Sequence, residues 1–258
     1  MTDHSGTNVE ALWLRRFHSS PGDRARLVCF PHAGGSASQF FPLSKALTPT
    51  VDMRAVQYPG RQDRRNEPCV EDLGELAAEI FDVLQKWTDL PLALFGHSMG
   101  AVLACEVAAR LEEAVGPGSV TRLFVSGRRA PSCRRIENVH ALDDEGLKAE
   151  IRLLNGTAPE LLHDEEVLAM ILPVLRSDYR AIETHHGDPA VRLTCPITIL
   201  TGDDDPHVSL EEARRWSRHT TGGSDLMVFP GGHFYLDDHV QEIADLISDA
   251  LRGVRSSR

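Results

Sequence analysis

A single serine, Ser98, lies between two glycines in the segment "FGHSMGA", a spacing that suits a hydroxyl used as a nucleophile. An apolar run typical of a buried strand precedes the segment and a helical pattern follows it, so the chain must turn sharply at the serine. Gly96 and Gly100 have no Cβ, which lets the strand and the helix approach closely. The sequence therefore predicts a strained elbow that presents the Ser98 hydroxyl at the positive end of the helix.

A serine hydroxyl needs a base to accept its proton and an anion to orient that base. Two later loops, each directly after an apolar run, could supply these groups. His233 follows two glycines in "PGGHFYL", and "TGDDDPHV" carries three consecutive acids. We expect Asp205 to be the acid because Pro206 favours an extended backbone there. Asp203 and Asp204 stay open as alternatives.

An early loop, "FPHAGGSA", carries two adjacent glycines directly after an apolar run. Such a loop can fold close to a ligand with its amides pointing inward. Acyl transfer needs two backbone donors for the oxyanion, and we expect them to be the amides of Ala33 and Met99. A phosphate-binding loop is the alternative, but neither GxGxxG nor GxxxxGK[ST] occurs.

Other histidines fit other roles. We expect His97, within the elbow, to point away from the nucleophile, and His207 to lie at the surface. His185 and His186 resemble part of a metal site, but no HxHxD or HExxH spacing accompanies them. The sequence predicts neither a metal nor a cofactor.

The elements that position these loops alternate along the chain. Apolar runs predict strands at 26–30, 53–58, 92–95, 123–126, 197–200 and 226–229, and their continuity indicates strands covered on both faces. Helical stripes begin at Leu73 and Val240, and the spacing of Ser209 and Glu212 predicts a capping box. This alternation predicts an α/β fold with a mostly parallel sheet flanked by helices.

Residues 131–187 interrupt the alternation because only helical patterns occur there. Pro173 should kink or divide the apolar helix that contains it. We expect residues 1–258 to form one domain, with 131–187 inserted as a helical lid over the site. An ordinary pair of packed helices is the alternative.

The net charge of −11 argues against a nucleic-acid partner. No apolar run is long enough to span a bilayer, and the polar, acidic N-terminus lacks a signal-peptide pattern, so we expect a cytoplasmic protein, as a monomer. Two arginine-rich segments could meet an acidic partner or simply lie solvated at the surface: Arg61, Arg64 and Arg65, and Arg128, Arg129, Arg134 and Arg135.

Taken together, "FPHAGGSASQF", "QYPGRQDRR", "FGHSMGA", "LTGDDDP" and "FPGGHFYL" resemble the motifs of type II thioesterases, which accompany polyketide and nonribosomal peptide synthetases. The resemblance implies an α/β-hydrolase fold with a mobile helical lid. It implies a triad of Ser98, Asp205 and His233, with oxyanion amides from Ala33 and Met99. It also implies a substrate, namely stalled acyl groups on the phosphopantetheine arm of an acyl or peptidyl carrier protein.

Two other functions remain open on the same residues. One is a carboxylic esterase or other acyl hydrolase, because a fold does not fix its substrate. The other is a non-catalytic accessory that binds carrier proteins and keeps a vestigial triad.

Overall fold

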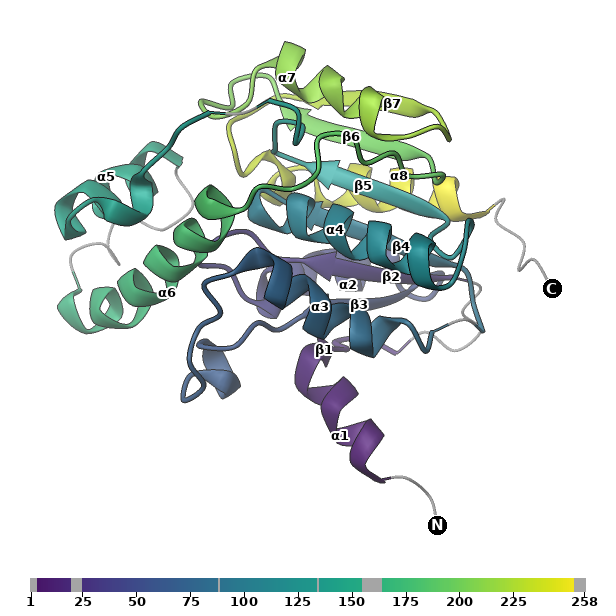
Figure 1. Ribbon diagram of the computed structural model, residues 1–258, viewed down its shortest axis with the longest axis horizontal. Helices are drawn as coiled ribbons and strands as arrows, with labels where there is room; N and C mark the ends of the chain where they lie inside the picture. Colours follow the sequence, from purple (N-terminus) through teal and green to yellow (C-terminus); the bar gives the residue numbers. More distant parts are fainter. Residues whose placement is uncertain (1–3, 20–24, 88, 134, 155–163, 253–258) are drawn as a thin grey trace.

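The computed structural model describes residues 4–19, 25–87, 89–133, 135–154 and 164–252. Its strands are β1 (Leu14–Arg15), β2 (Arg26–Phe30), β3 (Asp52–Val56), β4 (Leu92–His97), β5 (Arg122–Ser126), β6 (Ile197–Gly202) and β7 (Ser224–Phe229). They form one seven-stranded sheet in the order β1-β3-β2-β4-β5-β6-β7 (Figure 1). β1 pairs antiparallel with β3, and the other neighbours run parallel. The predicted α/β class with a mostly parallel sheet is confirmed.

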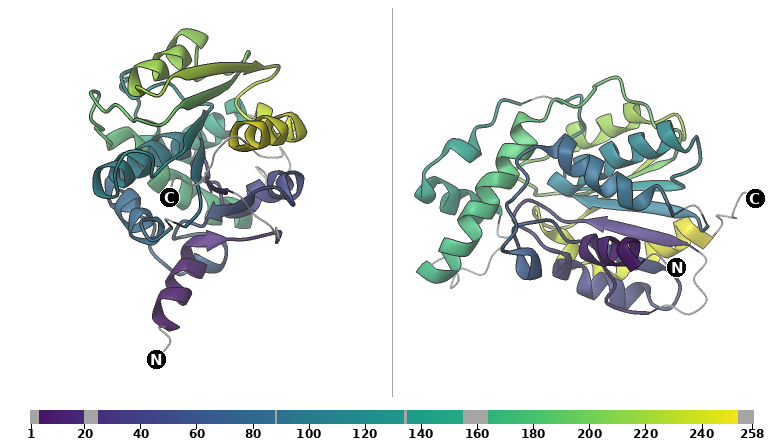
Figure 2. Two further views of the ribbon diagram at one scale, coloured as in Figure 1. Left: turned by 90° about the vertical axis from the view of Figure 1, so that its right-hand side faces the viewer. Right: turned by 60° about the horizontal axis from the view of Figure 1, so that its bottom comes forward.

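Helices cover both faces of this sheet and one of its ends. The described helices are α1 (His4–Trp13), α2 (Phe41–Leu47), α3 (Leu73–Leu84), α4 (Met99–Ala114), α5 (Asp144–Leu154), α6 (Glu165–Thr184), α7 (Leu210–Arg214) and α8 (Val240–Arg252). α3 and α4 pack on one face, and α2 and α8 pack on the other (Figure 2). Each face buries its own apolar cluster, which is what strands with continuous apolar runs require.

Every predicted strand is present, with three differences in detail. β3 ends at Val56, so Gln57 and Tyr58 belong to the following loop. β1 was not predicted because two residues are too few to show a period. The prediction of two covered faces is wrong for the edge strand β7, where Met227 and Val228 are exposed.

The predicted helix signals are also present. The apolar stripes of α3 and α8 are buried, and the Asp72 side chain caps α3 by accepting from the Glu75 amide. Ser209 and Glu212 form both hydrogen bonds of a capping box at the start of α7. No helix among the described residues is long and apolar enough to cross a membrane.

α5 and α6 lie together at the end of the sheet where the carboxyl ends of the central strands emerge (Figure 1). The described residues between 131 and 187 form helices and irregular segments, and none of them belongs to a strand of the sheet. Residues 134 and 155–163 of this region lie outside the described residues. α6 continues through Pro173, so of the two expected outcomes, a kink or a division, the division is wrong. The carbonyl that the proline leaves unbonded belongs to Ala169, which is exposed and can bond to water.

Candidate active site

The turn between β4 and α4 is held in a strained conformation by close packing. Ser98 has φ 55° and ψ −117°, a left-handed φ that side chains other than glycine rarely adopt. A Cβ on Gly96 would lie 2.1 Å from the Gly100 carbonyl oxygen, and one on Gly100 would lie 2.1 Å from the Phe30 carbonyl oxygen. Both glycines are therefore required for the helix to approach the strands, as the sequence predicted.

The loops after β6 and β7 bring an acid and a histidine together. His233 Nδ1 lies 2.8 Å from Asp205 Oδ2, and the two side chains are 3% and 0% exposed. The second Asp205 oxygen accepts from the His207 amide at 2.9 Å. Asp203 instead accepts from the Gly231 amide at 2.9 Å, which braces one loop against the other. Of the three consecutive acids, Asp205 is the one that bonds the His233 ring.

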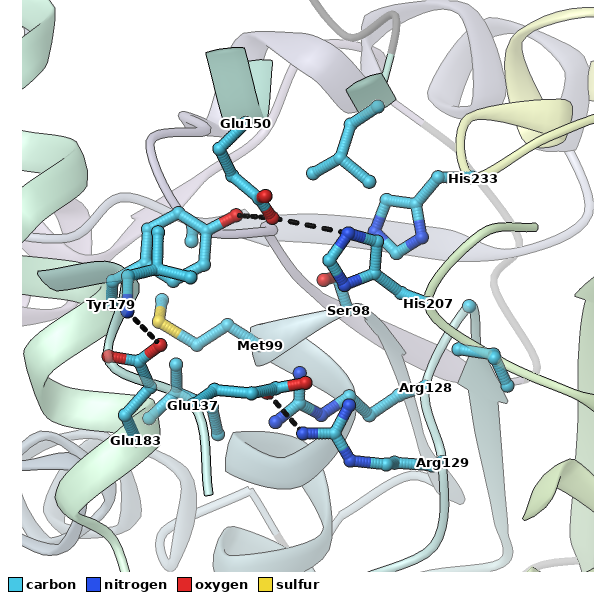
Figure 3. Close-up of a pocket in the computed structure, with 16 residues that line it drawn as sticks. Ser98, Met99, Arg128, Arg129, Glu137, Glu150, Tyr179, Glu183, His207 and His233 are labelled. Atoms are coloured by element: carbon cyan, nitrogen blue, oxygen red, sulfur yellow. Dashed lines mark hydrogen bonds and ion pairs between the residues drawn. The ribbon is translucent and has the colours of Figure 1, made fainter. Parts of the chain in front are cut away.

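Ser98, Met99 and His233 line one cavity (Figure 3). Ala33 lines it with them. Within the described residues, no acceptor bonds the Ala33 or the Met99 amide. Ser98 and His233 both line this cavity, and among the described residues no hydrogen bond joins Ser98 Oγ directly to the His233 ring. Two unused amides beside a hydroxyl are the donors that a tetrahedral oxyanion needs.

Two more histidines, the buried His97 and the half-buried His32, pack beside this site in their neutral form. His97 Nδ1 lies 2.9 Å from Ser126 Oγ, which in turn lies 2.6 Å from the Tyr235 hydroxyl. Burial lowers the pKa of His97 well below its usual range and that of His32 to about 4. The His97 ring centroid lies 5.0 Å from that of His233. His97 is thus engaged with Ser126, and it supports His233 without adding charge.

His207 does not lie at the surface, and that expectation is wrong. Its side chain is 24% exposed, it lines the cavity, and its Nε2 lies 3.2 Å from Glu150 Oε1 on α5 (Figure 3). The Tyr179 hydroxyl on α6 donates to the same Glu150 oxygen at 3.1 Å. The interaction with Glu150 raises the pKa of His207, and His207 lowers the pKa of Glu150. Both shifts favour the charged forms, and the contact links α5 to the loop that carries Asp205.

Most of the arginines singled out in the sequence are paired rather than solvated. Arg61, Arg64 and Arg129 are buried, so a solvated surface is the wrong interpretation for these three. Their partners are Asp178, Glu67 and Glu137 respectively. Arg128 is half-buried in the cavity wall. Arg65 and Arg135 are exposed, and Arg135 pairs with Glu212. Arg134 lies outside the described residues.

In the part of the chain that the structure describes, the remaining two histidines, His185 and His186, do not form part of a metal site. His185 Nε2 lies 3.0 Å from Glu106 Oε1, and His186 is exposed. Among the described residues, no group of three or more His, Cys, Asp or Glu side chains is arranged to hold a metal ion.

Known proteins resemble this chain along almost its whole length. The model of the thioesterase domain family matches residues 25–251. A probable cadicidin biosynthesis thioesterase of Streptomyces griseus is 53% identical over 97% of this chain and 69% of its own. Thioesterase PikA5 of Streptomyces venezuelae is 49% identical over 100% of this chain and 92% of its own. The structure of BorB, a type II thioesterase from the borrelidin biosynthetic cluster, superposes with a TM-score of 0.86 at 50% identity, covering 93% of this chain and 98% of BorB.

Proposed function

This chain belongs to the thioesterase family and is a type II editing thioesterase of polyketide or nonribosomal peptide biosynthesis, and we propose that Ser98, His233 and Asp205 are its catalytic triad. Its substrates would be acyl groups on the phosphopantetheine arm of carrier proteins. One observation carries the assignment: His233, which bonds the buried Asp205 carboxylate, shares a cavity with a strained serine.

The first half of the reaction transfers the acyl group to Ser98. Its Oγ attacks the thioester carbonyl carbon while His233 Nε2 takes the hydroxyl proton, and Asp205 holds the resulting imidazolium through Nδ1–H. The carbonyl oxygen becomes an oxyanion between the Ala33 and Met99 amides. When this intermediate collapses, the carbon–sulfur bond breaks and the departing sulfur takes the proton from His233.

The second half releases the acid. Water attacks the Ser98 ester, and His233 accepts its proton. Collapse of the second oxyanion returns that proton to Ser98 Oγ and frees the carboxylic acid. A thiol has a pKa near 8.5, so it departs with little proton assistance, and a triad with two amide donors suffices without a metal.

Residues 131–187 would act as the lid, and the cavity geometry supports this role. Leu154 of α5 and Tyr179 of α6 line the cavity beside Ser98. A larger, more open cavity adjoins it, and the two share Arg128, Glu137 and Glu183 among their lining residues. The shared wall suits a route by which a phosphopantetheine arm extends from a docked carrier protein to Ser98.

The proposal is tested by hydrolysis of a panel of acyl-loaded carrier proteins. Ser98→Ala should lower the rate by at least about 10³-fold, because the nucleophile is lost while the fold stays. Ser44→Ala is the matched control: its buried hydroxyl on α2 bonds His18 and lies apart from the cavity of Ser98, so activity should remain. An active Ser98→Ala enzyme would exclude the assignment.

Two further measurements separate the alternatives. A fluorophosphonate probe should label Ser98 in the folded protein, whereas a non-catalytic accessory would stay unlabelled. Matched oxygen and sulfur esters of one acyl group distinguish an esterase from a thioesterase, because a thioesterase should favour the sulfur ester.

A further inference from the structure

A second buried carboxylate joins α6 to the loop that carries Ala33. Asp178 Oδ2 accepts from the Gly34 amide at 2.7 Å and forms an ion pair with Arg61. The side chains of Asp178 and Arg61 are 4% and 7% exposed. A charged pair this deeply buried needs well-placed partners to offset the loss of water, so its geometry is tightly constrained.

The Gly34 amide belongs to a turn that includes the proposed oxyanion donor. The Gly35 amide donates to the His32 carbonyl at 2.9 Å, which closes a turn with Ala33 and Gly34 at its centre. Gly34 has φ 76°, the value typical of the third residue of a type II turn. Type I and type II turns differ by a flip of the central peptide, and Asp178 bonds the N–H of that peptide. The Ala33 N–H is attached to the same Cα as the carbonyl of this peptide, so fixing the peptide constrains the backbone beside the donor.

Arg61 presents a fixed cation to Asp178. Its guanidinium donates to the Pro59 carbonyl at 2.6 Å and lies 5.0 Å from the centre of the Tyr58 ring. The Arg61 carbonyl accepts from the Gln57 side chain at 3.2 Å. The arginine is therefore held by its own loop, and it holds the carboxylate of α6 in turn.

A packing contact reinforces the polar one. A Cβ on Gly34 would lie 3.0 Å from Leu175 Cδ1, so this leucine already rests against the turn. Leu175 and Asp178 are three residues apart on α6 and face the same way. One helical turn of α6 thus contacts one residue of the loop through both an apolar and a charged side chain.

We propose that Asp178, neutralised by Arg61, is a positioning residue that fixes the orientation of the Ala33 amide relative to the Met99 amide on α4. The inference rests on the proposed function, in which these two amides bind the oxyanion. Asp178 touches no substrate in this role. It acts on the transition state alone, because the oxyanion exists only after Ser98 has attacked.

The test compares two double variants that both remove the buried charges. Arg61→Met/Asp178→Asn keeps a side-chain oxygen that can accept from the Gly34 amide, whereas Arg61→Met/Asp178→Leu has the same shape without an acceptor. Turnover is measured with a small acyl thioester of N-acetylcysteamine, which does not depend on carrier docking. Affinity is measured for a trifluoromethyl ketone analogue, which forms a tetrahedral oxyanion adduct with a nucleophilic serine.

The leucine variant should have a kcat about tenfold or more below that of the asparagine variant, with KM within about twofold. Its affinity for the ketone should fall by a similar factor. Equal kcat and equal ketone affinity in the two variants, or a difference confined to KM, would overturn the positioning role. If the leucine variant does not fold, Arg61→Met/Asp178→Ser replaces it with the same expectation, because serine is too short to reach the amide.

Two controls separate this inference from its premises. Asp52→Asn removes another buried carboxylate that is paired with arginines, namely Arg16, Arg26 and Arg54. It lies at the start of β3, away from the site, so the variant should lower the melting temperature but not kcat. Ser98→Ala in the same assay tests the proposed function itself. If Ser98→Ala is inactive while the two double variants agree, only the role of Asp178 is wrong.

Discussion

Adding one methyl group at Gly100 tests whether the elbow holds both oxyanion amides in place. In Gly100→Ala, the new Cβ would lie 2.1 Å from the Phe30 carbonyl oxygen and 2.6 Å from that of Pro31. A carbon–oxygen contact is comfortable at about 3.3 Å. The helix and the strand end must therefore separate by about 1 Å.

This separation has a cost in stability and a larger one in rate. Overpacking of this kind typically costs about 1–3 kcal/mol, which in a chain of this size lowers the melting temperature by about 2–12 °C. Pro31 leads into the loop of Ala33, and Gly100 directly follows Met99. The movement thus separates the two amides, and a shift of about 1 Å at a reacting centre can cost about 10²-fold in kcat.

Thermal unfolding by circular dichroism and thioester hydrolysis measure the two effects on one sample. Gly116→Ala is the control. A Cβ there has no neighbour within 4 Å, but φ is 116°, so the substitution introduces backbone strain far from the cavity. It should lose stability and keep kcat. A folded Gly100→Ala enzyme with the kcat of the unmodified protein would refute the reasoning, because the contact would then not set the amide geometry.

The strain at Ser98 predicts that Ser98→Gly is more stable to urea than Ser98→Ala by about 1 kcal/mol. A left-handed φ costs alanine about 1–3 kcal/mol, whereas the greater flexibility of glycine in the unfolded chain costs less than this. The reverse order would show that the elbow is relaxed. Glu150→Gln should lower the melting temperature most between about pH 4.5 and 6.5, the usual pKa values of the two partners. The pair's contribution to stability is lost as pH falls through the lowered pKa of Glu150 or rises through the raised pKa of His207. The difference in melting temperature between the variant and the unmodified protein should therefore be smaller at pH 9. A gap that does not change with pH would contradict an ionic pair.

Local patterns were enough to predict the framework of the site. Strands buried on both faces leave continuous apolar runs, and the elbow needs glycines at fixed offsets from Ser98, so both are visible within a short window. Loop order along the chain identified His233 and the acidic loop. The preference for Asp205 rested on one neighbouring proline, and the hydrogen bond from His233 agrees with it.

Contacts between distant segments were not predictable in this way. Asp178 and Arg61 are 117 residues apart, and each alone is an ordinary polar residue in its own segment. His207 reads as an exposed loop residue until α5 brings Glu150 to it. Proline rules predicted a kink or a division of α6, but they do not show that Ala169, the residue with the freed carbonyl, is exposed, so that water can replace the lost partner.

The placement of α6 means that its side chains cannot be redesigned for one property at a time. Ile171, Leu175 and Tyr179 line the space beside Ser98, and Asp178 in the same stretch holds the turn of Ala33. A smaller side chain at Leu175 would enlarge the space for bulkier acyl chains and would also remove its contact with the turn at Gly34. Ile151 and Leu154 of α5 line the same space and lie apart from that turn's hydrogen bonds, so libraries meant to widen specificity belong on α5.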